Sequence, residues 1–139
     1  MVHNTPVTLG RPRQFDTDKA LSNATERFWR GGYAATSLQE LLDSMKISKS
    51  SLYQSFGNKE QLFVRCLDHY QQELDHALGV MLERAPSGIA FVRVLLDSVI
   101  KEADLAEPKG CLLVNTANEL AGREVTIAHA VNRGLNTIQ

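Results

Sequence analysis

The fold is decided by residues 47–63, which read ISKSSLYQSFGNKEQLF. Ser48 is suited to cap a short helix, because its hydroxyl can accept a hydrogen bond from an unpaired N–H group of the first turn. Leu52 and Phe56 follow four residues apart and therefore lie on one face of that helix. Ile47 before the cap fits a hydrophobic staple with Leu52, which fixes the angle at which the chain enters the helix. The stretch predicts a helix of about eight residues with one apolar face.

Two more short helices are expected upstream of this stretch. The first begins at an Asp16 or Thr17 cap and ends at Gly31-Gly32. The second is expected to begin at Thr36, which would form a capping box with Gln39. The apolar faces of these two helices are Ala20, Leu21, Ala24 and Phe28, and then Leu38, Leu41, Leu42 and Met45. A break of about three residues separates the second helix from the third, as in a helix-turn-helix.

The downstream part of the chain also has a helical pattern. Asn58 caps a long helix that is expected to run to about Arg84. A fifth helix is expected at residues 87–103, and its wide apolar face predicts that it is well buried. Shorter helices are expected at residues 111–121 and from Val125 onward. No segment has a convincing strand period, so the predicted fold class is all-α, with a three-helix head, a long linking helix and a helical body.

The third helix has the side chains of a DNA-reading element. Leu52 and Phe56 face inward, and the outer face carries one cation, one hydroxyl, one phenol and one amide with no acidic residue. The residues of this outer face are Lys49, Ser50, Tyr53 and Gln54. In a helix-turn-helix the third helix enters the major groove, where each base pair shows a distinct pattern of donors and acceptors. An ordinary helical bundle explains each of these side chains alone, but the ordered set favours DNA binding.

In this order the residues resemble the TetR family of bacterial regulators. The resemblance rests on Phe15-Asp16, Ala20-Leu21, FWRGGY at 28–33, TSL at 36–38 and the whole of 47–63. It is strong over residues 10–70 and weaker beyond. It implies a homodimeric repressor that binds double-stranded DNA at a palindromic operator and has a helical ligand-binding body. The family's members run longer than this chain and end in two more helices that build the dimer.

The resemblance also assigns roles by position. Members of the family read bases at the positions of Lys49, Ser50 and Gln54. They bind phosphates at the positions of Thr36, Tyr53 and Lys59. Many members have glycine where this chain has Lys46, so the turn before the third helix is expected to differ slightly.

The expected domains are a flexible basic arm at 1–14, a helix-turn-helix domain at 15–60 and a helical regulatory domain at 61–139, incomplete relative to the family. Arg11 and Arg13 lie on a proline-stiffened tether and are predicted to contact a minor groove, with an uninvolved tail as the alternative. Through Glu60 the chain has 8 lysines and arginines against 6 acidic residues, a net charge of +2; from Gln61 on it has 7 against 10, a net charge of −3. The second half would therefore repel phosphate.

The body is expected to bind a small apolar or electrophilic effector. The apolar candidates for the pocket lining are Phe91, Leu95, Val99 and Leu113, with Leu112 and Leu120 beside them. Core packing explains each of them equally well. Cys111 follows Lys109-Gly110 at a helix N-terminus, a setting that favours thiolate and therefore an electrophile sensor; a small buried residue is the alternative. Cys66, within the stripe of the long helix, is expected to be buried and inert.

Other classes of function lack sequence support. There is no glycine-rich phosphate loop, HExxH or GxSxG motif, so neither an enzyme nor a cofactor is expected. His69, Glu73 and His76 share a helix face, but a solvated surface explains them better than a metal site does. No membrane segment or leader is evident, which predicts a cytoplasmic protein. The alternative function is a shortened, non-regulatory interaction protein that binds a partner or titrates subunits.

Overall fold

The computed structural model describes residues 16–120 and 122–136 and folds them into helices alone, which confirms the all-α prediction. The helices are α1 Thr17–Gly31, α2 Leu38–Met45, α3 Lys49–Ser55, α4 Lys59–Arg84, α5 Gly88–Ala103, α6 Leu112–Leu120 and α7 Val125–Asn136. None of the helices in these two ranges is long and apolar enough to span a membrane.

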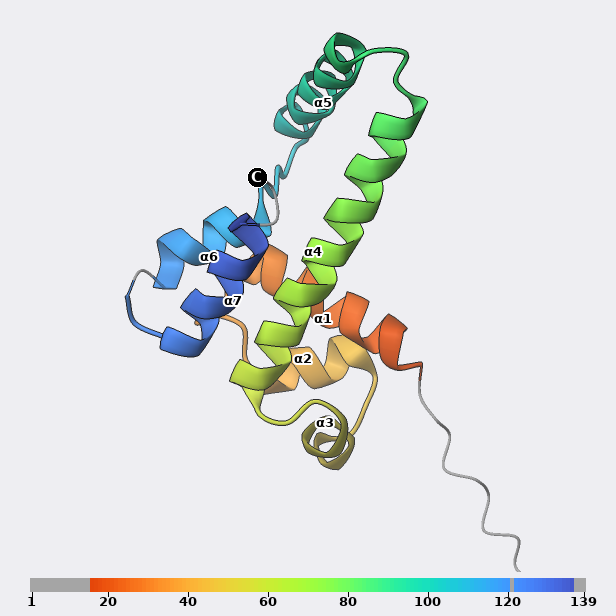
Figure 1. The fold of residues 1–139 in the computed structure, drawn as a ribbon. Helices are drawn as coiled ribbons and strands as arrows, with labels where there is room; N and C mark the ends of the chain where they lie inside the picture. The colour runs from red at the N-terminus through yellow and green to blue at the C-terminus, as the bar shows by residue number, and fades with distance from the viewer. Residues whose placement is uncertain (1–15, 121, 137–139) are drawn as a thin grey trace, which may run out of the picture.

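The long helix α4 is the axis of the molecule (Figure 1). Its first half packs against α1, α6 and α7, while its second half extends away from them and is accompanied by α5 alone. The short helix α3 lies at the end of the molecule opposite to α5. The structure therefore has a closely packed end that carries α3 and a thin α4–α5 hairpin at the other end.

Side-chain caps set most of the helix starts, as the sequence predicts. Asp16, Ser48 and Ser87 each accept a hydrogen bond from a backbone N–H group in the first turn of α1, α3 and α5. Asn58 and Gln61 form a reciprocal capping box at the start of α4. These caps satisfy N–H groups that the helix itself cannot pair.

The expected capping box of α2 is wrong by one residue. Ser37 is the cap, and it exchanges hydrogen bonds with Glu40 instead of Thr36 doing so with Gln39. Thr36 is 1% exposed, and its hydroxyl donates to the Gly32 carbonyl at 2.6 Å. Its hydroxyl is therefore engaged inside the protein, and the phosphate contact of Thr36 stays a prediction.

One apolar core joins the head to the C-terminal helices. The ring of Phe28 in α1 packs edge-on against Phe63 in α4, with centroids 4.6 Å apart. The same cluster of buried side chains continues into α6 and α7 through Leu112, Leu113, Ile127, Ala130 and Val131. The helix-turn-helix at 15–60 and the body at 61–139 therefore share a core in the described residues.

The burial expected for α5 is wrong. No residue of this helix, all of which is described, is buried. Phe91 and Leu95 are half-buried, while Ile89, Val92, Leu96, Val99 and Ile100 are at least half exposed. A wide apolar face shows that a helix can be covered on several sides, but among the described residues α4 is the one helix that packs extensively against α5.

Candidate nucleic-acid interface

Helix α3 presents the predicted set of polar side chains to solvent. Leu52 is fully buried and Phe56, just after the helix, is 4% exposed, so one face is anchored in the core. The exposed residues on its other side include Lys49, Ser50, Tyr53 and Gln54. No acidic residue lies within α3, so its outer face offers hydrogen-bond donors and one positive charge to an approaching polyanion.

Arg65 in α4 holds the end of α3 in place. Its guanidinium donates to the Ser55 carbonyl at 2.6 Å and lies 4.6 Å from the centroid of the Phe56 ring. The bond satisfies a carbonyl at the helix C-terminus, and the cation stacks on an aromatic face. Sequence analysis missed this residue because an arginine on a polar helix face looks like any solvated charge.

The turn between α2 and α3 uses Lys46 where glycine would be easiest. Lys46 has φ 56° and ψ 43°, the left-handed conformation, and it is the one non-glycine residue with positive φ in the described ranges. L-residues adopt this conformation at a steric cost. The turn is made with the geometry that glycine provides in many family members, and the lysine side chain stays exposed.

The residues predicted to bind phosphates lie in different parts of the structure and have different surroundings. Lys59 starts α4, and its ammonium lies 4.7 Å from the centroid of the Tyr33 ring. Burial, together with Glu124 and Glu60, raises the pKa of Tyr33, so this ring carries a neutral phenol at neutral pH. Tyr53 is 50% exposed on α3. Arg11 and Arg13 lie outside the described residues.

The packing of α2 on α1 is reinforced by an ion pair between Arg27 and Glu40. Hydrogen bonds from Ser37, first from its backbone N–H and then from its hydroxyl, together with Arg27, lower the pKa of Glu40 to about 2. The Glu40 carboxylate therefore both caps α2 and ties it to α1. These contacts hold α2 in place ahead of the turn that leads into α3.

Comparisons with known proteins agree with this geometry. Residues 20–66 match the family model described as bacterial regulatory proteins, tetR family. One solved structure is a cysteine mutant of CifR, a TetR family transcriptional regulator, in complex with 26-base-pair operator DNA, and it is 32% identical. The match covers 91% of this chain and 73% of that one, with a TM-score of 0.67. A second CifR cysteine mutant with operator DNA gives a TM-score of 0.68.

The chain belongs to the TetR family. An uncharacterised regulator of Bacillus subtilis, YezE, is 32% identical over 90% of this chain, and the repressor ComR of Escherichia coli is 32% identical over 88%. The chain spans 65% of the length of YezE and 59% of the length of ComR.

In this TetR-family chain, Glu119 of α6 is hydrogen-bonded to the loop between α1 and α2. Its carboxylate accepts hydrogen bonds from the backbone N–H groups of Tyr33, at 3.0 Å, and Ala34, at 2.8 Å. Gly32, with φ 79°, leaves room for it, because a Cβ there would lie 2.9 Å from a Glu119 oxygen. The body therefore holds the head by the loop that leads into α2.

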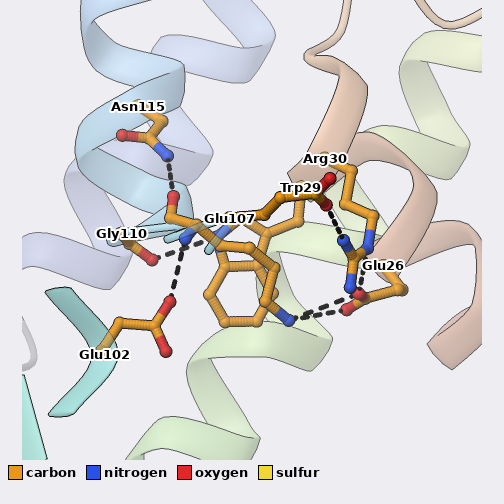
Figure 2. A network of polar contacts seen from close by, with 8 residues as sticks. Glu26, Trp29, Arg30, Glu102, Glu107, Gly110 and Asn115 are labelled. Atoms are coloured by element: carbon orange, nitrogen blue, oxygen red, sulfur yellow. Dashed lines mark hydrogen bonds and ion pairs between the residues drawn. The ribbon is translucent and has the colours of Figure 1, made fainter. Parts of the chain in front are cut away.

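A second set of contacts between head and body surrounds Trp29 (Figure 2). The indole N–H donates to the Gly110 carbonyl at 3.0 Å, and the Lys109 ammonium lies 4.0 Å from the centroid of the Trp29 ring. The same ammonium pairs with Glu26 at 3.0 Å, and Arg30 bridges Glu26 and Glu107. We call Glu26, Trp29, Arg30, Glu107, Lys109 and Gly110 the clasp. It ties the end of α1 to the loop between α5 and α6.

Charge within the clasp is balanced. Burial raises the pKa of Glu26, but hydrogen bonds from Lys109 and Arg30 outweigh it and leave the pKa lowered. Glu102 accepts from the Lys109 backbone N–H at 2.9 Å, and Asn115 donates to the Lys109 carbonyl at 2.7 Å. The whole Lys109 residue is thus held by groups on α1, α5 and α6. The contacts of Lys109 and Gly110 with α1 could not be predicted from local sequence patterns, because their partners lie 81 to 83 residues apart.

The two cysteines lie in different surroundings: Cys66 is buried, as expected, and Cys111 is only half-buried. Burial raises the pKa of Cys66 to about 12, which makes this thiol inert. Cys111 is half-buried before α6, and its thiol is hydrogen-bonded to the Tyr70 hydroxyl. Burial first, and then this contact, raise the pKa of Tyr70. The Lys109 ammonium, expected to act on the thiol, is engaged by Glu26 and Trp29 instead.

The residues predicted to line an effector pocket are spread over different surroundings. Leu113 is fully buried against α7, where a Cβ on Gly134 would lie 2.8 Å from it. Phe91 and Leu95 are half-buried on α5, and Val99 is 58% exposed. A hollow of about 520 Å³ is lined by other residues of α5, among them Ile89, Arg93 and Asp97. The effector pocket stays a prediction.

Proposed function

We propose that this TetR-family chain is a DNA-binding transcriptional repressor that reads operator bases with α3. The observation that carries the proposal is the division of α3 into one buried apolar face and one exposed face of polar, non-acidic side chains. A recognition helix needs this division, because it is held by the core while it inserts between the phosphate backbones. Two relatives that are named repressors, ComR and BdcR of Escherichia coli, support it, as do the CifR complexes with operator DNA.

Separate groups supply specificity and affinity. Lys49, Ser50 and Gln54 contact base edges, while Tyr53 and Lys59 bind phosphates. The amide of Gln54 suits adenine, and the ammonium of Lys49 suits guanine. The protein acts on chromosomal DNA in the cytoplasm, as a homodimer on a palindromic operator.

The test is a titration on double-stranded DNA selected from a random pool by the wild-type protein. Lys49→Ala and Gln54→Ala should each weaken binding to the selected site by about 1–3 kcal/mol and relax the preference at one base position. Lys101→Ala and Gln72→Ala are the matched controls, because Lys101 is exposed near the end of α5 and Gln72 is exposed in the middle of α4, away from its α3 end. Tyr53→Ala and Lys59→Ala should weaken binding to all sequences alike. Unchanged affinity in all four α3 and α4 variants would exclude groove reading by α3.

Regulation through Cys111 is the finer part of the proposal: modification by an electrophile releases the operator. Its support is positional, because Cys111 precedes α6 and α6 carries Glu119, which holds the head. A small maleimide should label Cys111 in the native protein and leave Cys66 unreacted until unfolding. Labelling should lower operator affinity, and Cys111→Ser should remove that response. Equal protection of both thiols would contradict the sensor.

A further inference from the structure

Helix α3 is held by less packing than any other helix in the described residues. Each of the other helices packs extensively against at least one neighbour, whereas α3 does so against none. The core anchors it through Leu52, which is its one buried residue, and through Phe56 directly after it. These two side chains are four residues apart and lie on one line along the helix. Two anchors on one line constrain the rotation of a short helix poorly, so a further contact is needed to fix its angle.

Arg65 of α4 supplies that contact. Its guanidinium donates to the Ser55 carbonyl at 2.6 Å and lies 4.6 Å from the centroid of the Phe56 ring. Ser55 is the last residue of α3, where carbonyl groups have no partner within the helix. A cation at this end also interacts favourably with the negative end of the helix dipole. Because the hydrogen bond goes to the backbone, it constrains the helix itself and not only a side chain.

The connection between α3 and α4 is short and crowded on the same side of α4. Gly57 has φ 82°, and a Cβ at this position would overlap the side chain of Gln61. The Gln61 carboxamide oxygen in turn accepts from the Asn58 backbone N–H at 2.9 Å. Gln61 and Arg65 are four residues apart, so they are neighbours on one face of α4. This face therefore holds both the connecting loop and the end of α3.

We propose that Arg65 is the positioning residue of the recognition helix: through the Ser55 carbonyl it sets the angle of α3 in the major groove. Lys49 and Gln54 lie near opposite ends of α3, so a change in this angle moves both away from their base edges at once. Arg65 has this effect without binding a base or a phosphate. The inference rests on the proposed function, because it concerns how α3 reads DNA, and it adds a residue of α4 to those that determine base preference.

The experiment titrates the full chain on the selected DNA and on its single-base variants. Arg65→Met keeps an unbranched side chain but loses the charge and the donors. It should weaken binding to the selected site about tenfold, the value of one hydrogen bond from a charged group, and relax the preference at the positions of Lys49 and Gln54 together. Arg65→Lys can still donate to the Ser55 carbonyl and should recover most of the preference. Arg84→Met, at the exposed far end of α4, is the matched control and should behave as wild type.

Salt dependence separates positioning from a direct phosphate contact. The slope of log affinity against log salt concentration should be the same for wild type and Arg65→Met, because the substitution removes no contact with DNA. A slope that falls by about 0.9, the value of one phosphate contact, would overturn the proposal. An unchanged base preference in Arg65→Met would overturn it as well.

Hydrogen exchange in the free protein tests the hold on α3 without DNA. The Phe56 N–H donates to the Leu52 carbonyl at 2.8 Å, and in Arg65→Met it should exchange about tenfold faster, while the amides of α1 keep their protection. Unchanged exchange at Phe56 would show that α3 is held without Arg65 and would contradict the proposal. A wild type that selects no DNA sequence would refute the proposed function and the role of Arg65 together. A selective wild type with an equally selective Arg65→Met would refute the role of Arg65 alone.

Discussion

Helices α1 and α5 are of similar length and both have an apolar face, but they end in different surroundings. Helix α1 buries Ala20, Ala24 and Phe28 against α2 and α4, whereas α5 buries none of its residues. The difference lies in how many neighbours each has. An apolar face adds stability only where another surface removes it from water. The head is thus a closed core, and the α4–α5 hairpin is a surface that is open to a partner.

The largest effect on stability is expected when one apolar side chain is truncated in each region. Phe28→Ala should lower the free energy of unfolding by about 3–5 kcal/mol, because it removes a ring packed against Phe63 and leaves a cavity. Leu96→Ala should change it by less than about 0.5 kcal/mol in urea titrations at a protein concentration too low for association. Similar losses at both positions would show that α5 is covered in the monomer.

A smaller effect is expected where the body holds the head. Glu119→Gln leaves one amide oxygen in place of two carboxylate oxygens, so it should lower the free energy of unfolding by about 1 kcal/mol. It should also speed hydrogen exchange at the amides of Tyr33 and Ala34, since both donate to Glu119. Glu83→Gln, on the exposed part of α4, is the control and should leave both amides unchanged. Protection that persists in Glu119→Gln would show that the loop is held without this carboxylate.

The smallest effect concerns the turn between α2 and α3. Lys46→Gly should raise the free energy of unfolding by about 0.5 kcal/mol, because glycine adopts the left-handed conformation without a Cβ penalty but loses more backbone entropy. Gln72→Gly, in the middle of α4, should lower it by about 1 kcal/mol. Thermal melting of the two variants separates a turn that favours glycine from a helix that does not. A loss of stability in Lys46→Gly would mean that the lysine side chain contributes more than the turn costs.

Local signals explain why the helices could be predicted and other features could not. Ser48, Asn58 and Ser87 each precede an apolar pattern, so their caps are visible in the sequence. At α2 the neighbours Thr36 and Ser37 both suit a cap, and each has a suitable partner three residues later. Only the burial of Thr36 distinguishes them.

In the candidate site, too, local features could be predicted from the sequence and contacts between distant segments could not. The exposed side of α3 follows from helix periodicity, because Leu52 and Phe56 must face the core. The clasp and Glu119 could not be predicted, since ion pairs and hydrogen bonds between distant segments leave no periodic pattern. The prediction that α5 is well buried was wrong. An apolar face favours contact with another surface, but the sequence of the helix does not show whether such a surface is present.

The contacts of Glu119 also bear on the order of events during protein synthesis. The Tyr33 N–H group and its acceptor are 86 positions apart in the chain. At a typical bacterial elongation rate, the ribosome needs on the order of 5–15 s to pass from one to the other. The nascent head therefore leaves the ribosome before α6 can fasten the loop ahead of α2. During that interval the Tyr33 and Ala34 N–H groups lack the acceptor that Glu119 supplies in the folded chain, although α3 and its anchor Arg65 have already been made.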